Sequence, residues 1–131
     1  MATGKFVTAI NCIDGRVHIP VINWLKASFD AEFVDHITEP GADKALASGS
    51  ADVLEAIKQK VLISVNAHNS RTVAVVGHHD CAASPVSEAQ HRQDIGGAVA
   101  TVKSWDLPVE VIGLWVNSEW QVQVVNPIER D

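Results

Sequence analysis

An unbroken apolar segment, TVAVVG at residues 72–77, constrains the fold more than any other part of this sequence. Its β-branched residues favour an extended backbone, and the absence of polar alternation is typical of a strand that is covered on both faces. Such strands occur in parallel sheets, because the crossover helices pack on either side. The segment therefore predicts a central strand of a parallel α/β sheet, ending at the polar cluster His78-His79-Asp80-Cys81.

Four further strand patterns lie on either side of this segment. They fall at residues 5–11, 32–38, 109–116 and 120–125, and the turn at 117–119 joins the last two as a hairpin. Because strands alternate with helical patterns, the first four strands are expected to run parallel. The predicted fold class is α/β, with a mostly parallel central β-sheet of about five strands, a C-terminal antiparallel edge strand and helices on both faces.

The helical patterns lie between these strands. Helices are predicted at residues 20–29, 43–48, 52–66 and 84–105. Pro20 is compatible with the first of them only in its first turn. For the last, Ser84 is expected as the N-cap and Pro85 as the first helical residue, with a weakening or kink at Gly96-Gly97.

Length and charge exclude several classes of protein. A chain of 131 residues suits one domain, since domains cluster near ~100–150 residues, and we expect residues 1–131 to form a single domain. With 16 acidic and 10 basic residues the formal charge is −6. The sequence has no basic cluster, so no nucleic-acid partner is predicted. No apolar run approaches the ~18 residues of a membrane helix, so no membrane partner is predicted.

Two cysteines, Cys12 and Cys81, are too few for the disulfide framework of a small secreted protein. They could form one bridge or bind a metal. The start of the sequence, MATGKFVTAINC, lacks the long apolar stretch and cleavage site of a signal peptide. We therefore expect a cytoplasmic protein with reduced thiols.

The cysteines and one histidine follow two predicted strands at the point where each strand ends. Cys12 follows the first strand, and His78 and Cys81 follow the central one. Because parallel strands place their carboxyl ends at one edge of the sheet, these side chains can converge there. Two thiolates and one imidazole are zinc ligands, and a set of three leaves a fourth position open. The sequence thus predicts a Zn²⁺ site formed by Cys12, His78 and Cys81.

Asp14 and Arg16 lie in the same short loop as Cys12. Asp14 could fill the fourth zinc position itself. Alternatively, Arg16 could hold the carboxylate in a bidentate ion pair, leaving Asp14 to accept a hydrogen bond from a zinc-bound water. An ordinary surface salt bridge between the two residues is the third interpretation.

Together, two motifs resemble those of the β-class carbonic anhydrases. They are Cys12-Ile13-Asp14-Gly15-Arg16 and Gly77-His78-His79-Asp80-Cys81, in this order and each at a strand end. The similarity extends less sharply over most of the chain, including the hairpin at 111–125. The chain departs from the family at Gly15, where Ser is common, at Ala82, where Gly is common, and at residues 38–41. Most members carry an N-terminal helical arm, whereas this sequence is expected to start directly at its first strand.

The resemblance implies a lyase, a carbonate dehydratase, that hydrates CO2 reversibly to bicarbonate and a proton by attack of zinc-bound hydroxide. It implies Cys12, His78 and Cys81 as metal ligands, Asp14 and Arg16 as a catalytic pair, and a homodimer or higher homo-oligomer. Two alternatives remain. One is a related zinc hydrolase that acts on COS or CS2, and the other is an inactive zinc-binding protein with this fold.

The remaining polar and aromatic side chains have simpler expected roles. His79 is expected to be a solvated neighbour, or a hydrogen-bond donor beside the metal ligands, rather than a proton shuttle. Asp80 is expected to be an acceptor near the site, and Glu39 a solvated loop acid. Four histidines lack ligand-like spacing and are expected at the surface or in satisfied hydrogen bonds: His18, His36, His68 and His91. The tryptophans are expected in the core or at a dimer interface.

Overall fold

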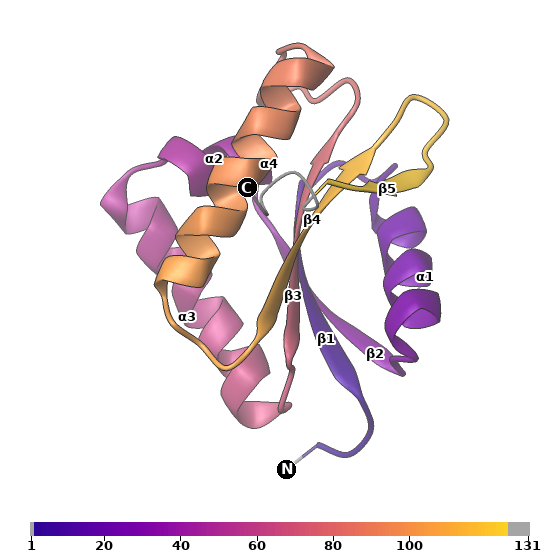
Figure 1. The fold of residues 1–131 in the computed structure, drawn as a ribbon, viewed down its shortest axis with the longest axis vertical. Coiled ribbons are helices and arrows are strands. Elements are labelled where there is room, and N and C mark those ends of the chain that lie inside the picture. Colours follow the sequence, from indigo (N-terminus) through magenta and orange to yellow (C-terminus); the bar gives the residue numbers. More distant parts are fainter. Residues whose placement is uncertain (1, 126–131) are drawn as a thin grey trace.

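One five-stranded sheet forms the centre of the protein, as seen in a computed structural model that describes residues 2–125. Its spatial order is β2-β1-β3-β4-β5 (Figure 1). The strands are β1 (Phe6–Asn11), β2 (Phe33–Thr38), β3 (Thr72–His78), β4 (Glu110–Val116) and β5 (Val122–Val124). Strands β2, β1, β3 and β4 run parallel, whereas β5 pairs antiparallel with β4 at the edge. The α/β fold with its antiparallel edge strand is confirmed.

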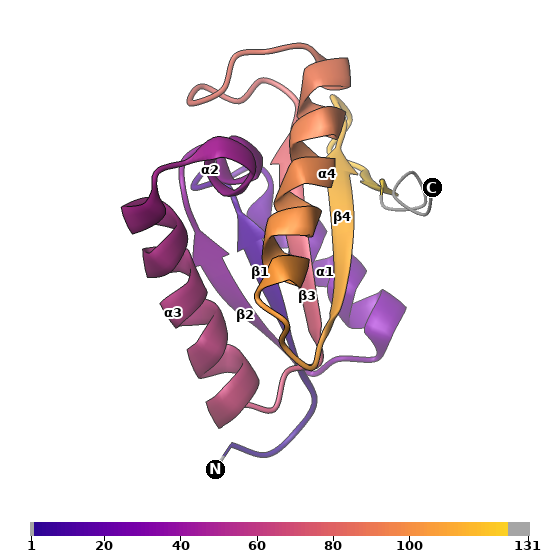
Figure 2. The ribbon, with the colours of Figure 1, turned by 60° about the vertical axis from the view of Figure 1, so that its left-hand side comes forward.

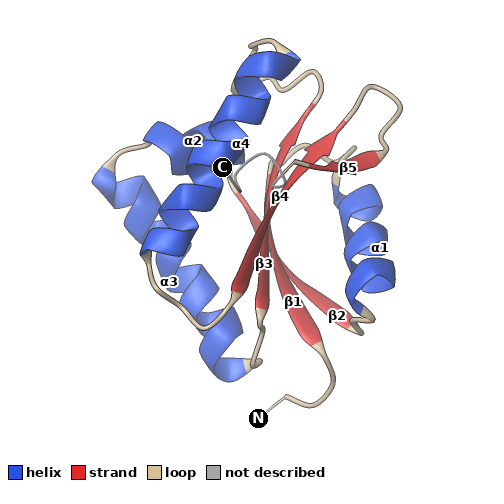
Figure 3. Cartoon of the chain, in the orientation of Figure 1, coloured by secondary structure: helices blue, strands red, loops and turns tan. Residues whose placement is uncertain are grey.

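Helices cover both faces of this sheet, as predicted (Figures 1 and 3). The helices are α1 (His18–Phe29), α2 (Ala42–Ser48), α3 (Ala51–Ala67) and α4 (Glu88–Ser104). Helix α1 lies alone on one face, and α2, α3 and α4 lie together on the other (Figure 2). Each face carries its own apolar cluster of alternate strand residues. None of the helices among residues 2–125 is long and apolar enough to cross a membrane.

Strand β3 is the central strand that its sequence predicts. All seven of its residues are buried, and it pairs with β1 on one side and β4 on the other. Val73 and Val75 enter the cluster beneath α3 and α4, while Ala74 and Val76 enter the cluster on the α1 side. An apolar run without alternation is therefore explained by two covered faces.

Helix α4 differs from its prediction at the N-terminus. It begins at Glu88, and its N-cap is Ser87, whose Oγ accepts a hydrogen bond from the Gln90 N–H at 3.1 Å. Ser84 as N-cap is wrong, because its carbonyl lies instead 3.0 Å from His91 Nε2 in a loop that precedes the helix. The helix continues through Gly97, where a Cβ atom would lie 3.1 Å from Ala47 Cβ. Gly97 thus permits close packing of α2 on α4.

The last strand is shorter than residues 120–125. Trp120 has a left-handed backbone with φ 60°, so β5 begins only at Val122. Asn117 organises the turn, because its Oδ1 accepts hydrogen bonds from the N–H groups of Glu119 and Gln121. This turn lies at the carboxyl end of the parallel strands, where the loops after β1 and β3 also lie (Figure 1).

Candidate metal centre

Cys12, His78 and Cys81 converge at the carboxyl ends of β1 and β3. Cys12 follows the last residue of β1, His78 ends β3, and the two strands are direct parallel neighbours. One ligand atom from each residue lies within 4.8 Å of the others, and all three residues are buried. Within residues 2–125 this is the one group of three or more such side chains that could hold a metal ion.

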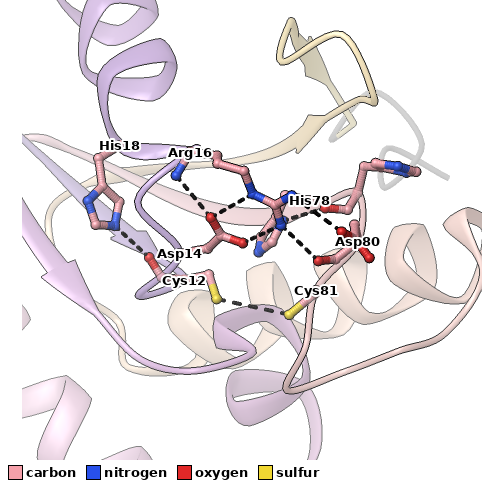
Figure 4. A network of polar contacts seen from close by, with 8 residues as sticks. Cys12, Asp14, Arg16, His18, His78, Asp80 and Cys81 are labelled. Atoms are coloured by element: carbon pink, nitrogen blue, oxygen red, sulfur yellow. Dashed lines mark hydrogen bonds and ion pairs between the residues drawn. The ribbon is translucent and has the colours of Figure 1, made fainter.

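The sulfur spacing fits a tetrahedral zinc site. The Sγ atoms of Cys12 and Cys81 lie 3.9 Å apart, and both cysteines are free (Figure 4). Two zinc–sulfur bonds of about 2.3 Å at a tetrahedral angle place their sulfurs about 3.8 Å apart. The two thiols are thus already spaced for one shared ion.

His78 supplies the clearest sign that a ligand belongs here. Its Nδ1 lies 2.7 Å from the His79 carbonyl oxygen, so Nδ1 carries the proton and donates it. Its Nε2 is then an acceptor, yet this atom is buried and has no hydrogen-bond partner. Buried polar atoms are rarely left without partners, and metal-binding imidazoles commonly donate their other nitrogen to a carbonyl. The ring is therefore in the tautomer that a zinc ligand needs.

Backbone N–H groups stabilise negative charge on the two sulfurs. Burial by itself raises the pKa of Cys12, but its interaction with the neighbouring His78 and hydrogen bonds from the backbone of Gly41 and Asp14 outweigh burial and lower this pKa to about 7. Burial and the neighbouring Cys12 raise the pKa of Cys81, although the backbone of Ser84 and Ala83 opposes them. One thiolate is thus available near neutral pH, and a bound cation would favour the second.

His78 also responds to this thiolate. Burial acts to lower the pKa of His78, but its interaction with Cys12 and its hydrogen bond to the His79 carbonyl raise the pKa above its usual value. A proton and a metal ion therefore compete for the same nitrogen, as they do at most imidazole sites.

Asp14 and Arg16 form the bidentate pair that the sequence allowed. Arg16 Nε donates to Asp14 Oδ1 at 3.0 Å, and Nη2 donates to Oδ2 at 2.7 Å (Figure 4). The Arg16 backbone N–H also donates to Oδ1, at 2.9 Å. These contacts hold the pKa of Asp14 well below its usual range, so the carboxylate stays ionised. It lies outside the three-residue ligand group.

Two further residues hold Arg16 in place. Asp80 accepts from Arg16 Nη1 through Oδ2 at 3.3 Å and from Nη2 through its carbonyl oxygen at 3.1 Å. The Arg16 Cζ lies 4.6 Å from the centre of the Trp120 ring, which comes from the β4–β5 turn. Asp80 was expected near the site. Trp120 was missed, because only the folded hairpin carries it to the loop after β1.

The other histidines do not join the ligand group. His79 is exposed, and its ring lies edge-on to Trp120, with 6.3 Å between ring centres. His18 Nε2 lies 2.9 Å from the Cys12 carbonyl oxygen and orients the loop. His91, expected at the surface or in a satisfied hydrogen bond, is buried, with Nδ1 2.6 Å from Asp43 Oδ2 and Nε2 3.0 Å from the Ser84 carbonyl oxygen.

These features together define an α/β protein with a buried Cys-His-Cys group, at the carboxyl ends of its strands, that could hold a metal ion. A family model described as "Putative carbonic anhydrase" matches residues 2–126. The chain belongs to this family, as its two motifs indicate.

Solved structures show the same fold. A β-carbonic anhydrase isoform from the protozoan Trichomonas vaginalis is 15% identical, with a TM-score of 0.60, and the match covers 90% of this chain and 81% of that chain. The β-carbonic anhydrase CafA of the fungus Aspergillus fumigatus is 10% identical, with a TM-score of 0.62, covering 92% of this chain and 74% of that chain. No curated protein sequence matches this chain. The structural matches establish the shared fold.

Proposed function

We propose that this chain is a zinc-dependent carbonic anhydrase, which hydrates CO2 reversibly to bicarbonate and a proton. The observation that carries the proposal is the unpartnered Nε2 of buried His78 beside two sulfurs 3.9 Å apart. Cys12, His78 and Cys81 would hold the ion. Bound there, zinc would supply Lewis acidity that lowers the pKa of a coordinated water and so makes a nucleophile near neutral pH.

Asp14 orients the reacting water in this proposal. Arg16 engages both carboxylate oxygens and keeps the pKa of Asp14 well below its usual range. The carboxylate therefore accepts a hydrogen bond through a remaining lone pair but does not store the proton at neutral pH. The released proton must leave through solvent or through another group.

Arg16 has two roles. Its bidentate grip keeps Asp14 turned away from the metal position, and its positive charge favours an anionic product nearby. The side chain of Asp14 is only 20% exposed, so this pair is better shielded than an ordinary surface salt bridge. This burial supports the catalytic interpretation of the pair.

A homodimer or larger assembly is part of the proposal. Ile13, beside Cys12 in the metal loop, is 61% exposed, and Ile19 in the first turn of α1 is 69% exposed. Burying these side chains against a second copy would remove apolar surface from water next to the site. Sedimentation equilibrium of the zinc-loaded chain tests this point. The single domain over residues 1–131 and the cytoplasmic location remain predictions.

Stopped-flow CO2 hydration by the zinc-loaded protein, at pH ~7–9, tests the activity. Rates clearly above the buffer background are expected. Arg16→Ala is expected to abolish turnover while zinc content is kept. The matched control is Arg92→Ala, since Arg92 forms an exposed ion pair with Glu88 within α4. The Arg92→Ala variant and the wild type should hydrate CO2 at the same rate.

The same preparation separates the alternatives. Release of hydrogen sulfide from COS or CS2, with CO2 hydration at background, would assign the chain to the related hydrolases. Full zinc content with no turnover of any of these substrates would leave an inactive zinc-binding protein. Full zinc retention in Cys81→Ser would refute the ligand assignment itself.

A further inference from the structure

Arg16 is held on one edge by Asp14, on another by Asp80, and on one face by the Trp120 ring. The two aspartates accept hydrogen bonds from the edges of the guanidinium, and the Trp120 ring lies against its face. The Arg16 side chain is 47% exposed and that of Asp80 70% exposed. The Arg16–Asp80 ion pair is this exposed and therefore contributes little by itself. The aromatic face is therefore the contact that distinguishes this arrangement.

Trp120 makes this contact from an unfavourable backbone conformation. Its φ is 60°, a region that L-residues with large side chains rarely adopt. Four other non-glycine residues within residues 2–125 share a positive φ: Asp30, Asn69, Asp80 and Asp106. All four are Asp or Asn, which tolerate this region. Trp120 is the exception.

Strain of this kind persists only where the surroundings impose it, and it concentrates at functional sites. Glycine would suit the backbone of this turn better than tryptophan. The turn itself does not need the ring, because Asn117 supplies its hydrogen bonds through Oδ1 and its carbonyl oxygen. The ring's contacts are the guanidinium of Arg16, the edge of His79 and the apolar cluster on the α1 side.

We propose that Trp120 is a positioning residue for Arg16. Its ring holds the guanidinium in the plane in which Nε and Nη2 both reach Asp14, and so keeps the Asp14 carboxylate turned away from the metal position. The β4–β5 hairpin thereby acts on the loop that follows β1. The effect on the metal rests on the proposed function, whereas the effect on the Arg16–Asp14 pair does not.

Solvent exchange of the Arg16 Nε–H, measured by NMR on the metal-free full chain, tests the first part. Trp120→Leu retains an apolar side chain at the cluster but removes the aromatic face. Trp120→Gly also relieves the backbone. Both are expected to speed exchange of this proton about two- to fivefold, the factor that corresponds to a cation–π contact of ~0.5–1 kcal/mol.

Two controls separate this effect from general loosening. Trp24→Leu removes another partly buried tryptophan, on α1, that packs on the same cluster and stacks edge-on to Phe29. Asp106→Gly relieves a positive φ at the turn after α4. Both should leave Arg16 exchange unchanged. Unchanged exchange in the two Trp120 variants, or an equal increase in Trp24→Leu, would overturn the proposal. If Trp120→Leu fails to fold, Trp120→Gly provides the same measurement.

The visible absorption of Co²⁺-loaded protein tests the second part, because it responds to the donor set around the ion. Wild type is expected to match Asp14→Asn, which has no carboxylate to bind, and Trp120→Gly is expected to differ from both. A Trp120→Gly spectrum identical to wild type would overturn the link to the metal. Absence of CO2 hydration by wild type would contradict the proposed function while leaving both spectroscopic results standing.

Discussion

Two histidines at the same end of the sheet, each only 1% exposed, have opposite hydrogen-bonding states. His91 uses both ring nitrogens, one toward the Asp43 carboxylate and one toward the Ser84 carbonyl oxygen. His78 uses only Nδ1, and its Nε2 has no partner. A ring with both nitrogens facing acceptors is a structural cation, whereas a ring with one free buried nitrogen is a candidate ligand.

His36 limits what can be concluded from a free nitrogen alone. Its Nε2 is also buried without a partner, yet no two further ligand atoms gather around it in the described part of the chain. The His18 ring lies edge-on to the His36 ring, 4.7 Å away between ring centres. A metal site therefore needs the free nitrogen and converging donors together, and residues 2–125 combine them at His78.

The largest expected effect is on metal affinity. His78→Ala removes a proposed ligand and is expected to weaken zinc binding by well over the ~10–100-fold that loss of an outer hydrogen-bond partner costs. His91→Gln, which changes an equally buried ring, should weaken it by no more than that range. Competition with a chromophoric chelator measures both. Equal losses of zinc affinity in the two variants would show that His78 and His91 do not differ in their importance for metal binding.

The two variants should affect folding stability in the reverse order, with the larger loss of unfolding free energy in His91→Gln. His91→Gln leaves the Asp43 carboxylate buried without its charged partner, which typically costs about 3–5 kcal/mol of unfolding free energy. Urea denaturation of the metal-free protein measures this loss. His78→Ala should cost less, because one of its nitrogens makes no hydrogen bond. Pairing His91→Gln with Asp43→Asn removes both charges and should recover part of the loss; no recovery would contradict an ion pair.

The His91 contribution should depend on pH. The hydrogen bond to Asp43 raises the pKa of His91 above the ~6.5 of an unfolded chain, and burial only partly opposes this. The charged ring is thus favoured by folding. Its contribution is fully present below pH ~6.5 and is lost as the pH rises through the higher folded value. The difference in unfolding free energy between wild type and His91→Gln should narrow over that range, and a widening gap would reverse the assignment.

The smallest expected effect is that of His36, whose contribution to folding stability should depend on pH in the opposite direction to that of His91. Burial and the neighbouring His18 lower the pKa of His36 to about 4, so folding favours its neutral form. This contribution is present above pH ~6.5 and is lost as the pH falls from there toward 4. Melting temperatures of His36→Gln should therefore decline less steeply in acid than those of wild type, with zinc content unchanged. An equally steep decline would argue against the buried neutral ring.

Much of the site could be predicted from the sequence because its residues are local to strand ends. The strand at 72–77 is apolar without alternation, so both its position in the middle of the sheet and the polar cluster at its end could be predicted from this segment. The Asp14–Arg16 pair needed only a tight loop. Ser84 as a helix cap failed because capping propensity is local, whereas the Ser84 carbonyl is held by His91 across the loop.

Contacts between distant segments were beyond such reasoning. Asp43 and His91 lie 48 positions apart and meet only because α2 packs on α4. Trp120 looked like the first residue of a strand, but its left-handed backbone turns the ring onto Arg16. No periodicity or motif encodes either contact.

By itself the sequence determined the fold class, the family and the identity of the candidate ligands, since hydrophobic patterning and ligand chemistry are properties of residue types and spacing. Only the tertiary structure decided which nitrogen of His78 is free, which histidine is a buried cation, and that the terminal hairpin reaches Arg16. These depend on which polar atoms find partners once water is excluded, and burial arises only when the whole sheet and its helices have packed.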